Sequence, residues 1–249
     1  MSQAGLALLL RAVKLLSFAL HYEEAAEIAR REGWDFSRYL GHLVELEIEE
    51  RRVRKVERVL KASHLPAAKT LSTVDTARLS ERVRQQLPVL VQGHFLKRAE
   101  NVLAFGLPGR GKTHLICAIG QELIHRGHSV LFTPAYSLVQ GLLVAKRALA
   151  LEREMRRLDR FEAVIIDDIG YVQQQPEEME VLFTFLAERY ERRSVLITSN
   201  RVFSQWDKIF KDPLTTAAAI DRLVHHCTIL ELTGPSYRAD HAGLCHCRR

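Results

Sequence analysis

From Glu100 onward, short apolar runs alternate with longer stretches in which apolar residues recur at helical spacing. The runs are Asn101–Phe105, Ser129–Thr133, Ala163–Asp167, Ser194–Ser199 and Cys227–Leu232, and the helical stretches are Thr113–Arg126, Ser137–Ala150 and Glu177–Arg192. Each run is rich in Val, Ile or Leu, as expected for a strand that is buried on both faces. Strands that alternate with helices favour a parallel sheet with crossover helices. The pattern therefore predicts an α/β, three-layer domain over residues 101–249.

The N-terminal part of the chain shows the helical period throughout and no convincing strand. We expect helices at Leu6–Leu20 and His21–Glu32, and a long helix from Phe36 to about Ser63. Residues 66–100 then form a connector with one further helix, Thr76–Leu87, that ends at Pro88. The expected organisation is a small all-α N-terminal domain (1–65), a connector (66–100) and the α/β domain (101–249).

Composition adds few constraints. A chain of 249 residues with 47% apolar composition can hold one α/β domain and a smaller appendage. Its net charge of +6 permits a polyanionic partner without requiring one. The four cysteines have neither disulfide-framework nor zinc-site spacing, and no apolar stretch reaches the length of a membrane span. We therefore expect a cytoplasmic protein with no membrane contact.

Charge changes sign along the long helix that is expected to end near Ser63. After an acidic middle, the segment Arg51–Lys61 carries more base than its local acids can pair. Its basic residues are Arg51, Arg52, Arg54, Lys55, Arg58 and Lys61. Two interpretations stay open, namely Glu-to-Arg pairs on a solvated helix and a surface that contacts the phosphates of DNA.

A phosphate-binding loop follows the first expected strand. The stretch fits G-x-x-x-x-G-K-[ST], and its candidate nucleotide-binding residues are Gly106, Pro108, Gly109, Arg110, Gly111, Lys112, Thr113 and His114. Glycines let the backbone N–H groups turn toward phosphate oxygens, and the helix that begins here adds its positive dipole. We expect Lys112 to reach the β- and γ-phosphates and the Thr113 hydroxyl to bind Mg²⁺.

Polar residues follow two later strands. Val164-Ile165-Ile166-Asp167-Asp168 resembles a Walker B strand, in which Asp167 binds Mg²⁺ and Asp168 polarises an attacking water. Asn200, after the strand Ser194–Ser199, can hydrogen-bond that water and a phosphate oxygen, the role called sensor 1. Acids at a strand end and an asparagine in a turn are also ordinary loop residues. Spacing alone singles out neither Arg222 nor Arg238, since isolated arginines usually form surface ion pairs.

The order and the residues of these motifs resemble those of the IstB-like helper ATPases of bacterial insertion sequences. These ATPases are relatives of the helicase loader DnaC within the AAA+ class. The region that resembles the family begins at Lys69. It includes the segments Gly111-Lys112-Thr113-His114-Leu115, Ile166-Asp167-Asp168-Ile169-Gly170-Tyr171, Thr198-Ser199-Asn200-Arg201, Asp221-Arg222-Leu223-Val224-His225-His226 and Gly234-Pro235-Ser236-Tyr237-Arg238. The chain departs from the family at Arg110, where a small residue is usual, and at Asp168, where AAA+ ATPases commonly carry glutamate. The shorter carboxylate is consistent with slow hydrolysis.

The resemblance implies an ATP-hydrolysing AAA+ fold that uses ATP and Mg²⁺. It implies that Arg222 is an arginine finger acting on a neighbouring subunit and that Arg238 is the sensor 2 arginine of its own subunit. It further implies a homo-oligomer on double-stranded DNA that recruits or activates an IstA-like transposase. Two alternatives share the phosphate site: a DnaC-like helicase loader, and a P-loop kinase for a small acceptor.

Overall fold

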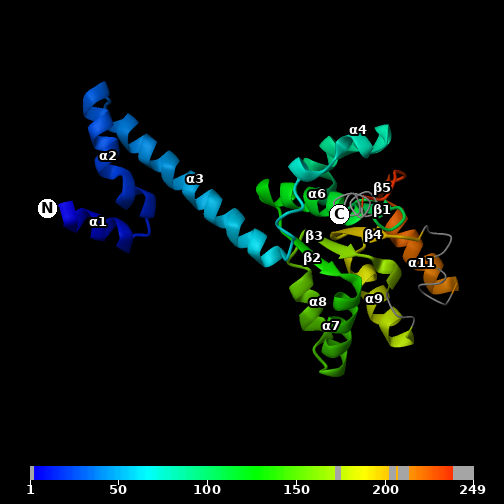
Figure 1. Cartoon of the computed structure of the whole chain (residues 1–249). Helices are drawn as coiled ribbons and strands as arrows, with labels where there is room; N and C mark the ends of the chain where they lie inside the picture. The colour runs from blue at the N-terminus through cyan, green and yellow to red at the C-terminus, as the bar shows by residue number, and fades with distance from the viewer. Residues whose placement is uncertain (1–2, 172–174, 202–205, 207–212, 238–249) are drawn as a thin grey trace, which may run out of the picture. The chain divides into compact units, whose positions relative to one another are not determined.

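The computed structural model describes residues 3–171, 175–201, 206 and 213–237 (Figure 1). The chain divides into two compact units, Met1–Arg58 and Val59–Arg249, and the division falls inside helix α3 (Phe36–Ser63). Each unit is described by itself. In the described part of the chain, no helix has the length and apolarity that a membrane span needs.

The N-terminal unit is built from helices only, as the periodicity predicts. Helices α1 (Gln3–Ala12) and α2 (Leu16–Glu32) precede α3, and Phe18, Ala25 and Leu43 form the small core between them. The break between α1 and α2 was expected after Leu20, which is wrong. It lies at Lys14, whose φ of 61° is left-handed, and bonds from Lys14 N–H to the Arg11 carbonyl and from Leu15 N–H to the Leu10 carbonyl close α1.

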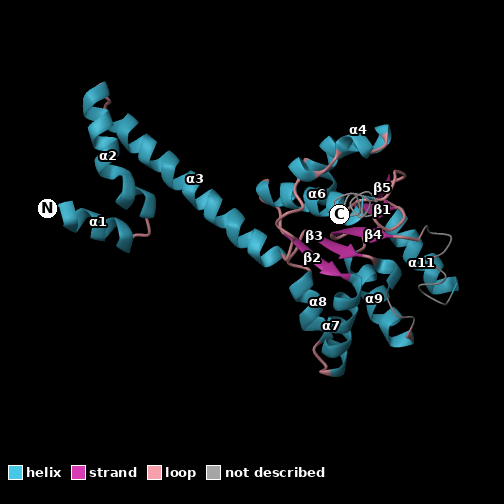
Figure 2. Cartoon of the chain, viewed as in Figure 1, coloured by secondary structure: helices cyan, strands magenta, loops and turns pink. Residues whose placement is uncertain are grey.

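The second unit contains a parallel sheet of five strands in the order β2-β3-β4-β1-β5, drawn in magenta in Figure 2. The strands are β1 (Asn101–Phe105), β2 (Val130–Pro134), β3 (Ala163–Asp167), β4 (Ser194–Ser199) and β5 (Cys227–Glu231). All five expected strands are confirmed, with ends shifted by one residue at most in β2 and β5. Strands β1 and β4 are buried over their whole length, which explains why they read as unbroken apolar runs.

Helices cover the sheet as a crossover topology requires. The expected helices correspond to α6 (Lys112–His125), α7 (Ala135–Arg147) and α9 (Pro176–Arg189). Among the described α-helices that follow β1, two were not expected, α8 (Leu151–Leu158) and α11 (Pro213–Val224). The helix expected to reach Ala150 ends at Arg147 because Leu149 takes a left-handed φ of 54°, and α8 follows as a separate helix.

The connector is folded onto the α/β unit. It contains short 3₁₀ turns η1 (Leu71–Thr73) and η2 (Thr76–Arg78), then α4 (Glu81–Val91) and α5 (His94–Lys97). The helix expected at Thr76–Leu87 instead begins after Ser80, whose hydroxyl accepts from Val83 N–H. Pro88 does not end it: the proline lies inside α4, where burial of Leu87 and Leu90 on either side holds the last turn in place.

Asn101 connects three elements beneath the site. Its side chain is 7% exposed, accepts from Val195 N–H of β4 at 3.0 Å and donates to the Leu223 carbonyl of α11 at 3.1 Å. Both partners are backbone groups that would otherwise lack these bonds in an interior without water. The amide therefore fixes the start of β1 against β4 and α11.

We expect Asn101→Ala to lower the free energy of unfolding by about 2–4 kcal/mol, because it removes two buried hydrogen bonds and leaves their partners unsatisfied. Urea denaturation of the full chain measures this change. Gln92→Ala, which removes an exposed amide from the end of α4, is the matched control. Equal stability of the two variants would contradict the role assigned to Asn101.

Candidate nucleotide-binding site

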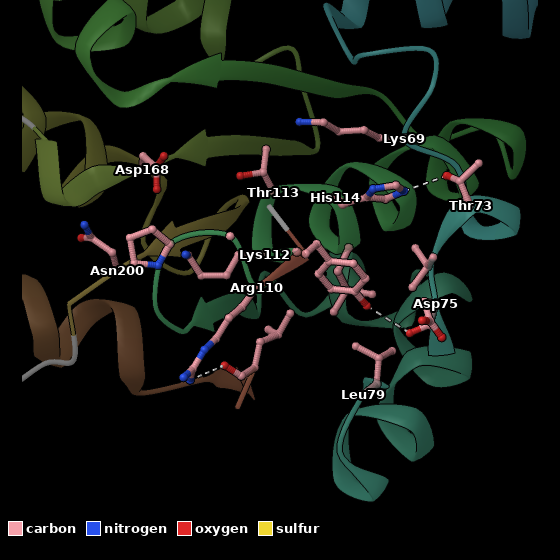
Figure 3. Close-up of a pocket in the computed structure, with 17 residues that line it drawn as sticks. Lys69, Thr73, Asp75, Leu79, Arg110, Lys112, Thr113, His114, Asp168 and Asn200 are labelled. Atoms are coloured by element: carbon pink, nitrogen blue, oxygen red, sulfur yellow. Dashed lines mark hydrogen bonds between the residues drawn. The ribbon is translucent and has the colours of Figure 1, made fainter. Parts of the chain in front are cut away.

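The candidate site is a cavity of about 340 Å³ at the edge of the sheet where the parallel strands end (Figure 3). The crevice at the carboxyl ends of strands is where α/β sheets generally bind ligands. Its wall is made by the loop after β1 and the start of α6, by residues after β3 and β4, by the connector, and by the segment after β5. The lining residues are Lys69, Thr73, Val74, Asp75, Leu79, Pro108, Gly109, Arg110, Gly111, Lys112, Thr113, His114, Leu115, Asp168, Asn200, Leu232 and Tyr237.

The P-loop has the backbone that its glycines predict. Gly109 and Gly111 have φ values of 83° and 82°, in the left-handed region where a side chain is strained. At Gly106 a Cβ atom would lie 2.6 Å from the Leu232 carbonyl oxygen, so a larger residue would push the loop off β5. Lys112 is 5% exposed, and its Nζ donates to the Leu107 carbonyl at 3.1 Å, within the loop itself.

Asp167 joins the P-loop helix to two strands. Its Oδ1 accepts from the Thr113 hydroxyl at 2.8 Å and from the Thr198 hydroxyl at 2.6 Å. The Thr198 oxygen in turn accepts from Asp168 N–H at 2.8 Å, and Asp168 has a left-handed φ of 56°. Thr198 therefore orients both acids of the Walker B pair. This role is not evident from the sequence, because a threonine inside a strand is ordinary.

Asn200 lies beside Asp168 at the same side of the cavity (Figure 3). Its Oδ1 is buried and accepts no hydrogen bond within the described part of the chain. A Cβ atom at Gly170 would collide with this oxygen, so the glycine leaves room for the amide. A buried acceptor without a donor is costly, and such groups are characteristic of sites that bind a ligand.

The opposite wall comes from the connector, the first turn of α6 and the segment after β5. Thr73 of η1 and His114 of α6 are joined at 2.7 Å between the hydroxyl and Nε2, and burial lowers the pKa of His114, so the ring is neutral at pH 7. Tyr237 N–H donates to the Gly109 carbonyl at 2.9 Å, and the Arg78 guanidinium stacks 4.6 Å above the Tyr237 ring. Only His114 among these four had been predicted.

The predicted arginines take separate positions. Arg110 turns away from Lys112 in Figure 3, and its Nη1 donates to the Leu232 carbonyl at 3.3 Å. Arg222, in the last turn of α11, does not line the cavity. Its guanidinium stacks 4.7 Å from the Phe183 ring, and its buried Nη1 finds no partner in the described chain. Arg238 lies outside the described residues.

The six basic residues of α3 divide into two groups. Arg51, Arg52 and Arg54 form ion pairs with nearby glutamates, and the closest joins Arg51 to the buried Glu47 at 2.6 Å. Lys55, Arg58 and Lys61 are exposed, and none has an ion pair among the residues that the structure describes. The ion-pairing interpretation therefore applies to the first three, while the other three keep their charge available.

The donor set fits a nucleotide triphosphate with a magnesium ion. Carboxylate and hydroxyl oxygens from Asp167 and Thr113 are the ligands that Mg²⁺ prefers. A glycine loop at the start of α6, with Lys112 at its base, fits the phosphates. This fold and this set of side chains define a P-loop nucleotide-binding protein of the AAA+ class.

Comparison with known proteins identifies the family. Residues 8–244 match the family described as IstB-like ATP binding protein, and the chain belongs to that family. An insertion sequence ATP-binding protein of Sinorhizobium fredii is 43% identical over 95% of this chain and 80% of its own length. The insertion sequence IS21 ATP-binding protein of Pseudomonas aeruginosa is 36% identical over 94% of this chain and 88% of its own.

Solved structures agree on the fold. DnaI matches 68% of this chain and 95% of its own with a TM-score of 0.57 and 21% identity. The DnaC helicase loader matches 71% of this chain and 99% of its own with a TM-score of 0.54 and 14% identity. At these identities the likeness shows the fold alone, and it confirms the AAA+ architecture expected from the motifs.

Thr198→Val should weaken binding of ATP with Mg²⁺ about tenfold, because the change leaves Asp168 N–H unpaired and Asp167 one donor short. Valine has nearly the shape of threonine, so the effect isolates the hydroxyl. Titration with a fluorescent ATP analogue measures the dissociation constant. Thr184→Val, in α9 and outside the cavity, is the control, and equal affinity in both variants would refute the role of Thr198.

Proposed function

We propose that the protein is an ATPase that assembles on duplex DNA and recruits or activates a partner transposase. The observation that carries this proposal is the meeting of Lys112, Asp167, Asp168 and Asn200 at one sheet edge, in a chain of the IstB-like family. Relatives of this chain are ATP-binding proteins of insertion sequences. A transposase encoded in such an element is the partner that this context favours.

Each residue has a distinct part in the proposed hydrolysis. Thr113 and Asp167 would hold the magnesium ion, which when bound would supply positive charge that stabilises the phosphates. Lys112 leaves the Leu107 carbonyl and donates to the phosphates. Asp168 accepts a hydrogen bond from the attacking water and polarises it, and the Asn200 amide orients the same water.

Arg222 is proposed to act on the nucleotide of a neighbouring copy. It lies outside the cavity of its own chain, and its guanidinium rests on Phe183 with one nitrogen unsatisfied. This position supports a role across a subunit boundary. Arg238 is proposed as sensor 2 from the family resemblance, and the residue before it, Tyr237, donates its N–H to the Gly109 carbonyl of the P-loop, which supports this assignment.

DNA contact is proposed for the basic residues of α3 whose charge is available, namely Lys55, Arg58 and Lys61. Arg51, Arg52 and Arg54 contribute less, since they already pair with glutamates. Contacts of this kind bind phosphates rather than bases, so affinity should depend steeply on salt and little on sequence.

Light scattering tests the assembly, with and without ATP–Mg²⁺ and with and without random duplex DNA. Growth into a large complex that needs both ligands is the expected result. Lys112→Ala should abolish this growth by removing the phosphate contact, and Asp168→Asn should retain it while ATP is no longer turned over. A monomer in all four conditions would contradict the proposal and favour a helicase loader, whereas phosphate transfer to a small acceptor would favour a kinase.

Arg222→Ala should bind ATP like the wild type and lose at least about a thousandfold in turnover, which is the contribution of an arginine finger. Phosphate release measures turnover, and Arg147→Ala, at an exposed ion pair on α7, is the control. A mixture of Arg222→Ala with Lys112→Ala distinguishes the two geometries. A finger that acts in trans restores activity at interfaces between the two variants, and a mixture that stays inactive would refute the assignment.

A further inference from the structure

A second lysine lines the nucleotide cavity from outside the P-loop. Lys69 belongs to the connector, two residues before η1, and its side chain is half-buried. Figure 3 shows its side chain extending into the cavity toward the side that holds Thr113 and Asp168. It approaches from the connector wall, whereas Lys112 rises from the P-loop. The two ammonium groups therefore enter the cavity from different elements.

The connector is held on both sides of Lys69. Before it, the Gln121 side chain of α6 donates to the Pro66 carbonyl at 2.8 Å. After it, Thr73 is joined to His114 at 2.7 Å, and a Thr70–Thr73 capping box closes η1. The backbone that carries Lys69 is thus held along α6, so its side chain starts from a fixed point on the connector wall of the cavity.

Lys69 has no ion pair among the described residues, although Asp75 and Asp168 line the same cavity. Lys69 shares this cavity with Lys112 and with the N-terminus of α6, and a half-buried ammonium in such surroundings is unfavourable without an anion. A polyphosphate supplies that anion. The uncompensated positive charge is therefore best explained as preformed for a ligand.

We propose that Lys69 donates to the terminal phosphate of the bound nucleotide and is a second phosphate-binding lysine. The inference rests on the proposed function, in which this cavity binds ATP. It adds a consequence for regulation: because Lys69 belongs to the connector, loss of the terminal phosphate releases one of the contacts between the connector and the nucleotide. Lys69 thereby makes the connector sensitive to whether ATP or ADP is bound.

Calorimetric titration with ATPγS–Mg²⁺ and with ADP–Mg²⁺ tests this. Lys69→Met keeps the length of the side chain and removes its charge, and it should weaken ATPγS binding about tenfold or more, as expected for a charge-assisted hydrogen bond. ADP binding should change less than about twofold, since ADP lacks the terminal phosphate. Lys69→Arg should largely restore ATPγS binding. Lys97→Met, at an exposed lysine of α5, should bind both nucleotides like the wild type.

The outcomes separate this inference from the proposed function. Wild-type protein that binds neither nucleotide would remove the ATPase proposal itself. If the wild-type protein binds both nucleotides and Lys69→Met has the same ratio of ATPγS to ADP affinities as the wild type, the role of Lys69 is overturned and the ATPase proposal stands. An equal loss for both nucleotides, together with a lower unfolding temperature without ligand, would show that Lys69 only supports the fold and would likewise overturn the inference.

Discussion

One carboxylate oxygen, Asp167 Oδ1, accepts hydrogen bonds from the hydroxyls of Thr113 and Thr198 and so joins α6, β3 and β4 at a single point. These elements meet because the strand order β3-β4-β1 brings their carboxyl ends to the same edge of the sheet. An oxygen held by two donors has its direction fixed before a ligand arrives, which is what preorganisation of a charged site requires. The P-loop, Asp168 and Asn200 are arranged around it.

Much of this arrangement can be predicted from sequence, because its signals are local. The P-loop and Asp167 each adjoin a buried apolar run, so the motif supports the prediction of the strand and the strand supports the interpretation of the motif. All five strands can be predicted from such apolar runs. Helix ends depend instead on single residues such as Lys14 and Leu149, which adopt left-handed backbone that apolar periodicity does not reveal. Thr198 is missed for a different reason: its hydroxyl matters only because β3 and β4 are neighbours, which is a tertiary fact.

The connector and α3 show two further limits of sequence reasoning. Residues 66–100 carry no motif, yet Thr73 and Asp75 line the nucleotide cavity because the connector runs along α6. In α3, the numbers of basic and acidic residues predict an excess of positive charge, but they do not show which basic side chains form ion pairs with glutamates. Pairing with Glu47 depends on the buried position of that carboxylate, where it also accepts Ser17 N–H at 2.8 Å. The available charge is smaller than the composition implies.

The position of β1 between β4 and β5 has a consequence for biosynthesis. The P-loop follows β1, near the middle of the chain, but one edge of β1 stays unpaired until β5 is made, and Leu232 and Tyr237 complete the wall against the loop. During translation the nucleotide pocket therefore cannot close until β5 and Tyr237 have left the ribosome. A nascent chain that ends before β5 carries the complete P-loop motif without a complete pocket, and one edge of its apolar strand β1 is left without a neighbouring strand.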